Sequence, residues 1–84
     1  MTGRVEVLVR LFGQHREAAG GSVVSVQLAE GGTVGDLRRA LAADPALGIS
    51  LEGAAVAVNR TYQSDEAPIV DGDEVAVIPP VAGG

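Results

Sequence analysis

Cysteine is absent from the 84-residue sequence, which excludes a disulfide framework, a thiol nucleophile and a thiolate metal site. Lysine is absent too: six arginines face eleven acidic residues, and the formal net charge is −5. An acidic chain with only two aromatic residues, Phe12 and Tyr62, repels nucleic-acid phosphates, so we expect no nucleic-acid partner. No run approaches the ~20 apolar residues of a membrane span, and no signal peptide is seen. We therefore expect no membrane partner and a cytoplasmic location.

Side chains for independent catalysis are also scarce. His15 is the single histidine, and it falls in a connection that we expect to lie on the surface, without partners for acid–base work or metal binding. Three carboxylates cluster in Asp71-Gly72-Asp73-Glu74, but the other ligands of a calcium loop are missing, so we interpret the segment as a turn. We expect no bound cofactor, no metal site and no enzyme activity of the chain alone.

The hydrophobic residues, 46% of the chain, are mainly Val, Ala and Leu, which favours one compact domain. Val5 to Phe12 alternates apolar residues with others, which predicts a strand whose second face still carries Leu8 and Phe12. Val23 to Leu28 predicts a second strand. The connection between them includes a short helical turn closed by Gly20-Gly21, so the two strands are predicted to pair antiparallel.

The clearest local signal begins at Thr33. Thr33 and Asp36 have the spacing of a capping box, and apolar residues then recur at helical spacing until Asp44-Pro45 ends the helix. Such a short helix must pack on the apolar face of a sheet. Further strands are predicted over Ala54–Asn59 and Val75–Ile78.

This order of elements predicts an α+β fold, with a mixed sheet of four to five strands and one main helix packed across it. We expect residues 1–78 to form the domain and residues 79–84 to form a flexible, extended C-terminal tail. Pro79-Pro80 cannot continue a sheet ladder, and Gly83-Gly84 carries no side chains. The tail is therefore either a frayed end or a bare arm that presents the α-carboxylate of Gly84.

The sequence resembles the ubiquitin-like, β-grasp sulfur carriers, most closely the small subunits of molybdopterin synthase. The resemblance covers most of the chain and is carried by residues 9–17, 33–37, 58–60, 71–75 and 79–84. The last block is the most specific.

Membership would imply that an E1-like enzyme uses ATP to adenylate Gly84, and that a sulfur donor protein converts it to a thiocarboxylate. The tail would enter the large synthase subunit and sulfurate cyclic pyranopterin monophosphate. The missing lysines then have two readings, a high-GC coding bias or avoidance of amines that would attack an activated terminus. The chain would act as a non-catalytic subunit of a heteromeric sulfurtransferase.

We expect the partner to contact an exposed apolar cluster and the tail beside it. The candidate contact residues are Leu8, Phe12, Tyr62, Ile78, Pro79, Pro80, Val81, Ala82 and Gly83. Three alternatives stay open: a sulfur carrier for thiamin or cysteine biosynthesis, a protein modifier conjugated through Gly84, and a non-covalent binding module. The sequence decides neither the pathway nor the stoichiometry.

Overall fold

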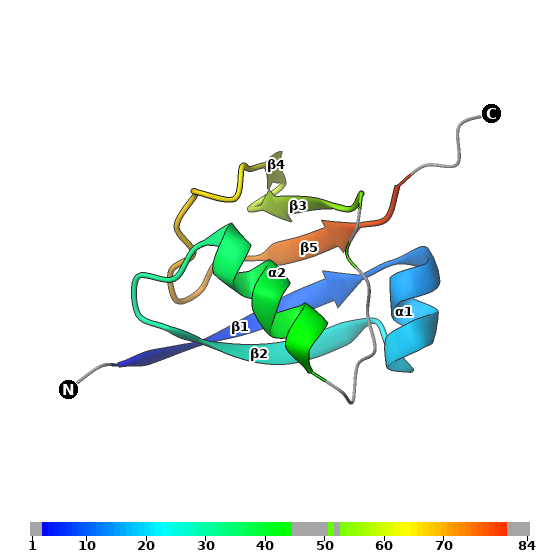
Figure 1. Cartoon of the computed structure of the whole chain (residues 1–84), viewed down its shortest axis with the longest axis horizontal. Helices are drawn as coiled ribbons and strands as arrows, with labels where there is room; N and C mark the ends of the chain where they lie inside the picture. The colour runs from blue at the N-terminus through cyan, green and yellow to red at the C-terminus, as the bar shows by residue number, and fades with distance from the viewer. Residues whose placement is uncertain (1–2, 45–50, 52, 81–84) are drawn as a thin grey trace.

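A computed structural model describes residues 3–44, 51 and 53–80 (Figure 1). The elements follow one another as β1 (Arg4–Leu11), α1 (Gly13–Ala19), β2 (Val23–Ala29), α2 (Val34–Ala43), β3 (Ala55–Val58), β4 (Thr61–Tyr62) and β5 (Val75–Ile78). The strands form one five-stranded sheet in the order β2-β1-β5-β3-β4. β1 and β5, the first and last of these strands in the chain, thus lie side by side inside the sheet.

Strand directions make the sheet mixed. β1 pairs antiparallel with β2 and parallel with β5, and β3 pairs antiparallel with both β5 and β4. The predicted antiparallel pair of the first two strands is confirmed, as is the α+β class with its mixed sheet. α1 adds a regular second helix where the sequence indicated only a helical turn.

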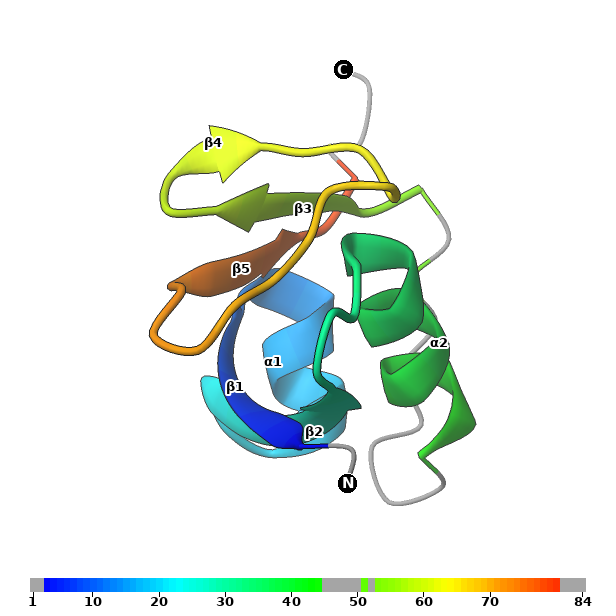
Figure 2. The same ribbon diagram turned by 90° about the vertical axis from the view of Figure 1, so that its left-hand side faces the viewer.

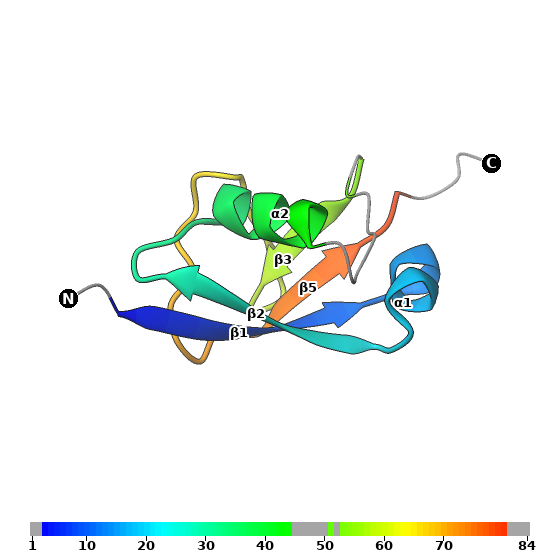
Figure 3. The same ribbon diagram turned by 60° about the horizontal axis from the view of Figure 1, so that its bottom comes forward.

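The core lies between α2 and one face of the sheet (Figures 2 and 3). Val34, Leu37 and Leu41 of α2 are completely buried, and they join a cluster that includes Val9 and Val75 of the two central strands. Each such side chain stabilises the fold by about 1.5–3 kcal/mol relative to leaving it in water. Among the described residues, no helix is both long and apolar enough to cross a membrane.

The capping box at the start of α2 is confirmed. The Asp36 backbone N–H donates to Thr33 Oγ1 at 3.3 Å, and the Thr33 backbone N–H donates to Asp36 Oδ2 at 3.0 Å. This backbone hydrogen bond, followed by the one from Arg39, holds the pKa of Asp36 below its ordinary value of 3.8. Asp44 adopts an extended conformation directly after the helix, as predicted.

The surface position expected for His15 is wrong. Its side chain is only 2% exposed, and it is the one residue of α1 that is buried. A seven-residue helix is too short to display a periodic apolar face in the sequence, so the inward position could not be recognised. α1 lies at the end of the sheet where β1 finishes, and this docking turns one polar residue inward (Figure 1).

Candidate docking face and tail root

The sheet face opposite α2, here called the open face, is not covered by any described element (Figure 3). Strand alternation and register place these residues on it: Leu8 and Arg10 of β1, Val23 of β2, Ala76 and Ile78 of β5, Ala57 of β3 and Tyr62 of β4. Phe12 follows β1 with extended backbone angles and continues the same alternation. The end of the open face near Phe12 is therefore rich in apolar side chains, whereas Arg4, Glu6, Ser25 and Gln27 follow the same alternation at its other end.

The structure brings the predicted contact residues together on this face. Leu8 and Phe12 are 56% and 44% exposed, as the alternation of the sequence predicted, and Tyr62 is 70% exposed. Ile78 is half-buried rather than freely exposed, because it pairs with Ala55 of the neighbouring strand. Their role in binding a partner stays a prediction.

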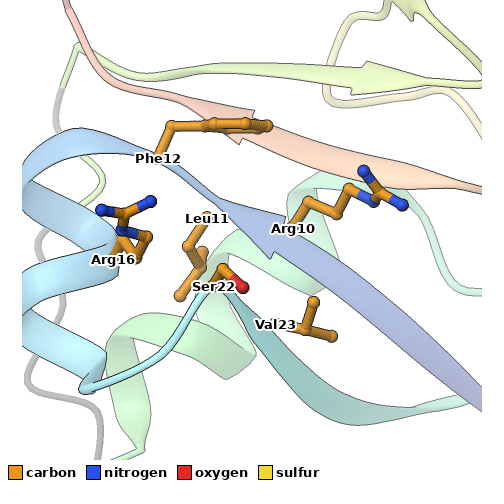
Figure 4. A pocket seen from close by; sticks show the side chains of 6 residues that line it. All are labelled: Arg10, Leu11, Phe12, Arg16, Ser22 and Val23. Atoms are coloured by element: carbon orange, nitrogen blue, oxygen red, sulfur yellow. The ribbon is translucent and has the colours of Figure 1, made fainter.

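A hollow of about 260 Å³ lies on the open face, lined by Arg10, Phe12, Ala57, Arg60, Glu74, Ala76 and Ile78. Two alanines line this hollow, and their short side chains leave room among the larger residues. A second hollow of about 240 Å³ lies beside it, and Arg10 and Phe12 line both. Figure 4 shows the Phe12 side chain reaching from the end of β1 toward β5, while Arg16 extends from α1. The face can thus receive a protruding apolar side chain from a partner.

The turn from β3 to β4 supports one edge of this face. Asn59 and Arg60 both have positive φ, at 52° and 69°, as the two central residues of a type I′ hairpin turn do. The Asn59 side chain accepts from the Glu74 backbone N–H at 3.0 Å and donates to Asp73 Oδ1 at 2.9 Å. Asn59 thereby ties the turn to the segment that begins β5, and so fixes the position of Tyr62.

The tail root, residues 78–80, leaves the sheet between two glycines. A Cβ atom added at Gly13 would lie 3.3 Å from Pro79 Cγ, and one added at Gly53 would lie 3.6 Å from Pro80 Cβ. Both glycines have positive φ, at 54° and 77°, which a side chain would strain. The half-buried Pro79 thus lies close to Gly13, and the exposed Pro80 lies close to Gly53.

The last four predicted site residues, Val81, Ala82, Gly83 and Gly84, lie outside the described residues, so the flexible tail over 79–84 stays a prediction. Among the described residues, no group of His, Asp and Glu side chains has the arrangement of a metal site. Gly13, Gly53 and Arg10 were not identified as site residues from the sequence. For the two glycines no sequence signal exists, because their role depends on contacts with the distant prolines.

Comparison with known proteins identifies the family to which the chain belongs. The model of the ThiS family matches residues 9–84, and the chain belongs to this family. It is 36% identical over 83 residues to the molybdopterin synthase sulfur carrier subunit of Chlamydomonas reinhardtii, covering 95% of this chain and 100% of that protein. It is 41% identical over 81 residues to the subunit of the same name from Escherichia coli (strain K12), covering 93% and 99%.

Solved structures agree. Small archaeal modifier protein 1 of Haloferax volcanii superposes with a TM-score of 0.77 at 31% identity, covering 92% of this chain and 99% of that one. Subunit 1 or 2 of the molybdopterin-converting factor from Helicobacter pylori 26695, solved as a protein–protein complex of the two, gives 0.66 at 27% identity, covering 95% and 100%. A ubiquitin of Caldiarchaeum subterraneum gives 0.69 at 20% identity, covering 98% and 100%. The expected ubiquitin-like β-grasp fold is confirmed.

Proposed function

We propose that this chain is the sulfur carrier subunit of a molybdopterin synthase, and that its reactive group is the α-carboxylate of Gly84. The observation that carries the proposal is the tail root: two prolines that lie close to glycines, next to an exposed apolar face, in a chain related to subunits of that name.

A free carboxylate resists nucleophilic attack because of its negative charge. An E1-like enzyme removes this obstacle when a Gly84 oxygen attacks the α-phosphorus of ATP, with loss of pyrophosphate. Sulfur delivered at the oxidation level of sulfide then attacks the carbonyl carbon, and AMP leaves. The resulting thiocarboxylate supplies sulfur to cyclic pyranopterin monophosphate. Glycines at positions 83 and 84 admit the tail to a narrow channel because no Cβ obstructs it.

The large synthase subunit is the proposed partner of the open face and the tail. The complex formed by the two subunits of the H. pylori factor supports such an assembly. Leu8, Phe12, Tyr62 and Ile78 supply the apolar contact, and Pro79 to Gly83 lead Gly84 into the catalytic subunit. The activating enzyme and the sulfur donor are the other partners in this proposal.

Intact-mass measurement tests the proposal directly. The chain is co-expressed with an E1-like enzyme and a sulfur donor, and the expected product is heavier by the difference between one sulfur and one oxygen. A chain that lacks Gly84 should fold normally and stay unmodified, whereas Leu8→Ala should still be modified if the activating enzyme is in excess. An unchanged mass of the wild-type chain with active partner enzymes would contradict the proposal.

The similarity to small archaeal modifier protein 1 favours a second candidate, conjugation through Gly84 to amines of target proteins. The same activated carboxylate serves both functions, since a lysine amine can replace the sulfur nucleophile. Immunoblots of cells would show bands of higher mass that disappear when Gly84 is deleted. Free chain alone on the blots, together with the thiocarboxylate mass, would assign the chain to sulfur transfer.

A further inference from the structure

The open face carries an arginine that has no carboxylate partner among the described residues. The ion pairs among the described residues are Arg38 with Asp65, Arg39 with Asp36, and Arg60 with Glu74. Arg10 takes part in none of them, although the chain has eleven acidic residues for six arginines. The unpaired guanidinium is therefore not explained by a shortage of carboxylates.

The residues next to Arg10 in the sheet register and along β1 are apolar. Val23 on β2 and Ala76 on β5 stand directly opposite it in the sheet register, and Leu8 and Phe12 flank it along the chain. Arg10 is exposed, so water solvates its charge in the free chain. A partner that covered this face would remove that water, and a buried guanidinium without an anion is strongly disfavoured.

Two carboxylates of the chain lie near Arg10: Glu74 lines the same hollow, and Asp73 and Glu74 line a neighbouring hollow with Arg10. Glu74 pairs with Arg60, whose Nε lies 3.7 Å from Glu74 Oε1, and Asp73 accepts from the Asn59 side chain and from the Val70 backbone N–H. No carboxylate oxygen of the described residues comes within ion-pair distance of Arg10. The charge of Arg10 is available to a second molecule.

We propose that the protein which docks on the open face presents an Asp or Glu side chain, set among apolar residues, to the guanidinium of Arg10. This inference rests on the proposed function, in which that protein is the large synthase subunit. The planar guanidinium binds a carboxylate through two parallel hydrogen bonds, which fixes orientation as well as charge. Arg10 lines the hollow next to Phe12 and Ile78, so the ion pair would set the register of the partner relative to the tail root.

Arg4 provides a matched control. It lies on β1, is exposed on the same face as Arg10, and likewise takes part in no ion pair among the described residues. The two arginines are six positions apart along the strand, a distance of about 20 Å. Arg4→Gln and Arg10→Gln change the net charge equally, so both should weaken long-range attraction to the partner to a similar extent. Only Arg10→Gln removes an ion pair beside the tail root.

Titration calorimetry with the purified large subunit tests the inference on the full-length chain. We expect Arg10→Gln to weaken binding about tenfold or more and Arg10→Lys to weaken it less, while Arg4→Gln stays within about twofold of wild type. Urea midpoints of all variants should agree, which excludes misfolding. The loss at Arg10 should largely persist in high salt, because salt screens a covered ion pair much less than long-range attraction between exposed charges.

Two results would overturn the inference while leaving the proposed function intact. In the first, the wild-type chain binds and Arg10→Gln binds equally well. In the second, Arg4→Gln and Arg10→Gln weaken binding to the same extent, as general charge steering would. A wild-type chain that acquires no thiocarboxylate and does not bind the large subunit would overturn both.

Discussion

The two faces of the sheet use the same alternation of residues for different purposes. On the covered face, Val9 and Val75 are completely buried under α2. On the open face, Leu8 and Phe12 of the same strand region stay about half exposed. The covered face thus contributes to folding in the isolated chain, whereas the open face contributes its apolar area only when a second protein covers it. Substitutions on the two faces should therefore change different measurable quantities.

The largest effect on stability is expected from the covered face. Leu37→Ala removes a completely buried side chain of α2 and should lower the free energy of unfolding by about 2–5 kcal/mol. Leu8→Ala, on the open face, is the size-matched control and should change it by less than about 0.5 kcal/mol. Urea denaturation measures both, and equal losses would contradict the division between the faces.

The largest effect on binding is expected from the open face. Phe12→Ala should weaken binding of the large synthase subunit by about tenfold or more, because aromatic anchors carry a large part of interface energies. Its urea midpoint should stay close to that of the wild type, since Phe12 is 44% exposed. Calorimetry on the folded variant measures the affinity, and unchanged affinity would remove Phe12 from the docking face.

The contact between the tail root and Gly53 allows a further test of how the tail is positioned. Gly53→Ala and Gly20→Ala introduce a side chain at nearly the same positive φ, 77° and 75°, so each should cost about 1 kcal/mol of stability. Of these two, only the Cβ atom added at Gly53 lies within 4 Å of a proline of the tail root. We expect Gly53→Ala to slow thiocarboxylate formation several-fold beyond Gly20→Ala, measured by timed intact-mass spectra. Equal rates would show that this contact does not position the tail.

The smallest effect is expected from pH, at the capping box of α2. The folded-state pKa of Asp36 lies below its unfolded value, so its contribution to stability is present at neutral pH and is lost as pH falls through the folded-state pKa. Asp36→Asn lacks this contribution. The difference between the urea midpoints of variant and wild type should therefore narrow between neutral pH and about pH 3. A difference in urea midpoint that stays constant with pH would show that the hydrogen bonds of Asp36 stabilise the helix independently of its charge.

Much of the fold could be predicted because its signals are local. Thr33 and Asp36 lie three residues apart, and the capping box needs only that spacing. The exposure of Leu8 and Phe12 followed from strand alternation, which is local too because it repeats every two residues. His15 was assigned wrongly, because its burial depends on where α1 docks at the end of the sheet rather than on its own neighbours.

The sequence by itself determined four of the five described strands, all but β4, together with the main helix, the charge of −5 and the ending Pro79-Pro80 to Gly83-Gly84. Tertiary structure decided which residues meet. Parallel pairing of β1 with β5 joins Arg10 to Ala76 across more than sixty positions, and chain return brings Gly13 and Gly53 against the two prolines. Such contacts depend on sheet order and helix docking. Residue type and spacing specify the elements, but only packing in three dimensions turns one face of the sheet and the tail root into a single candidate site.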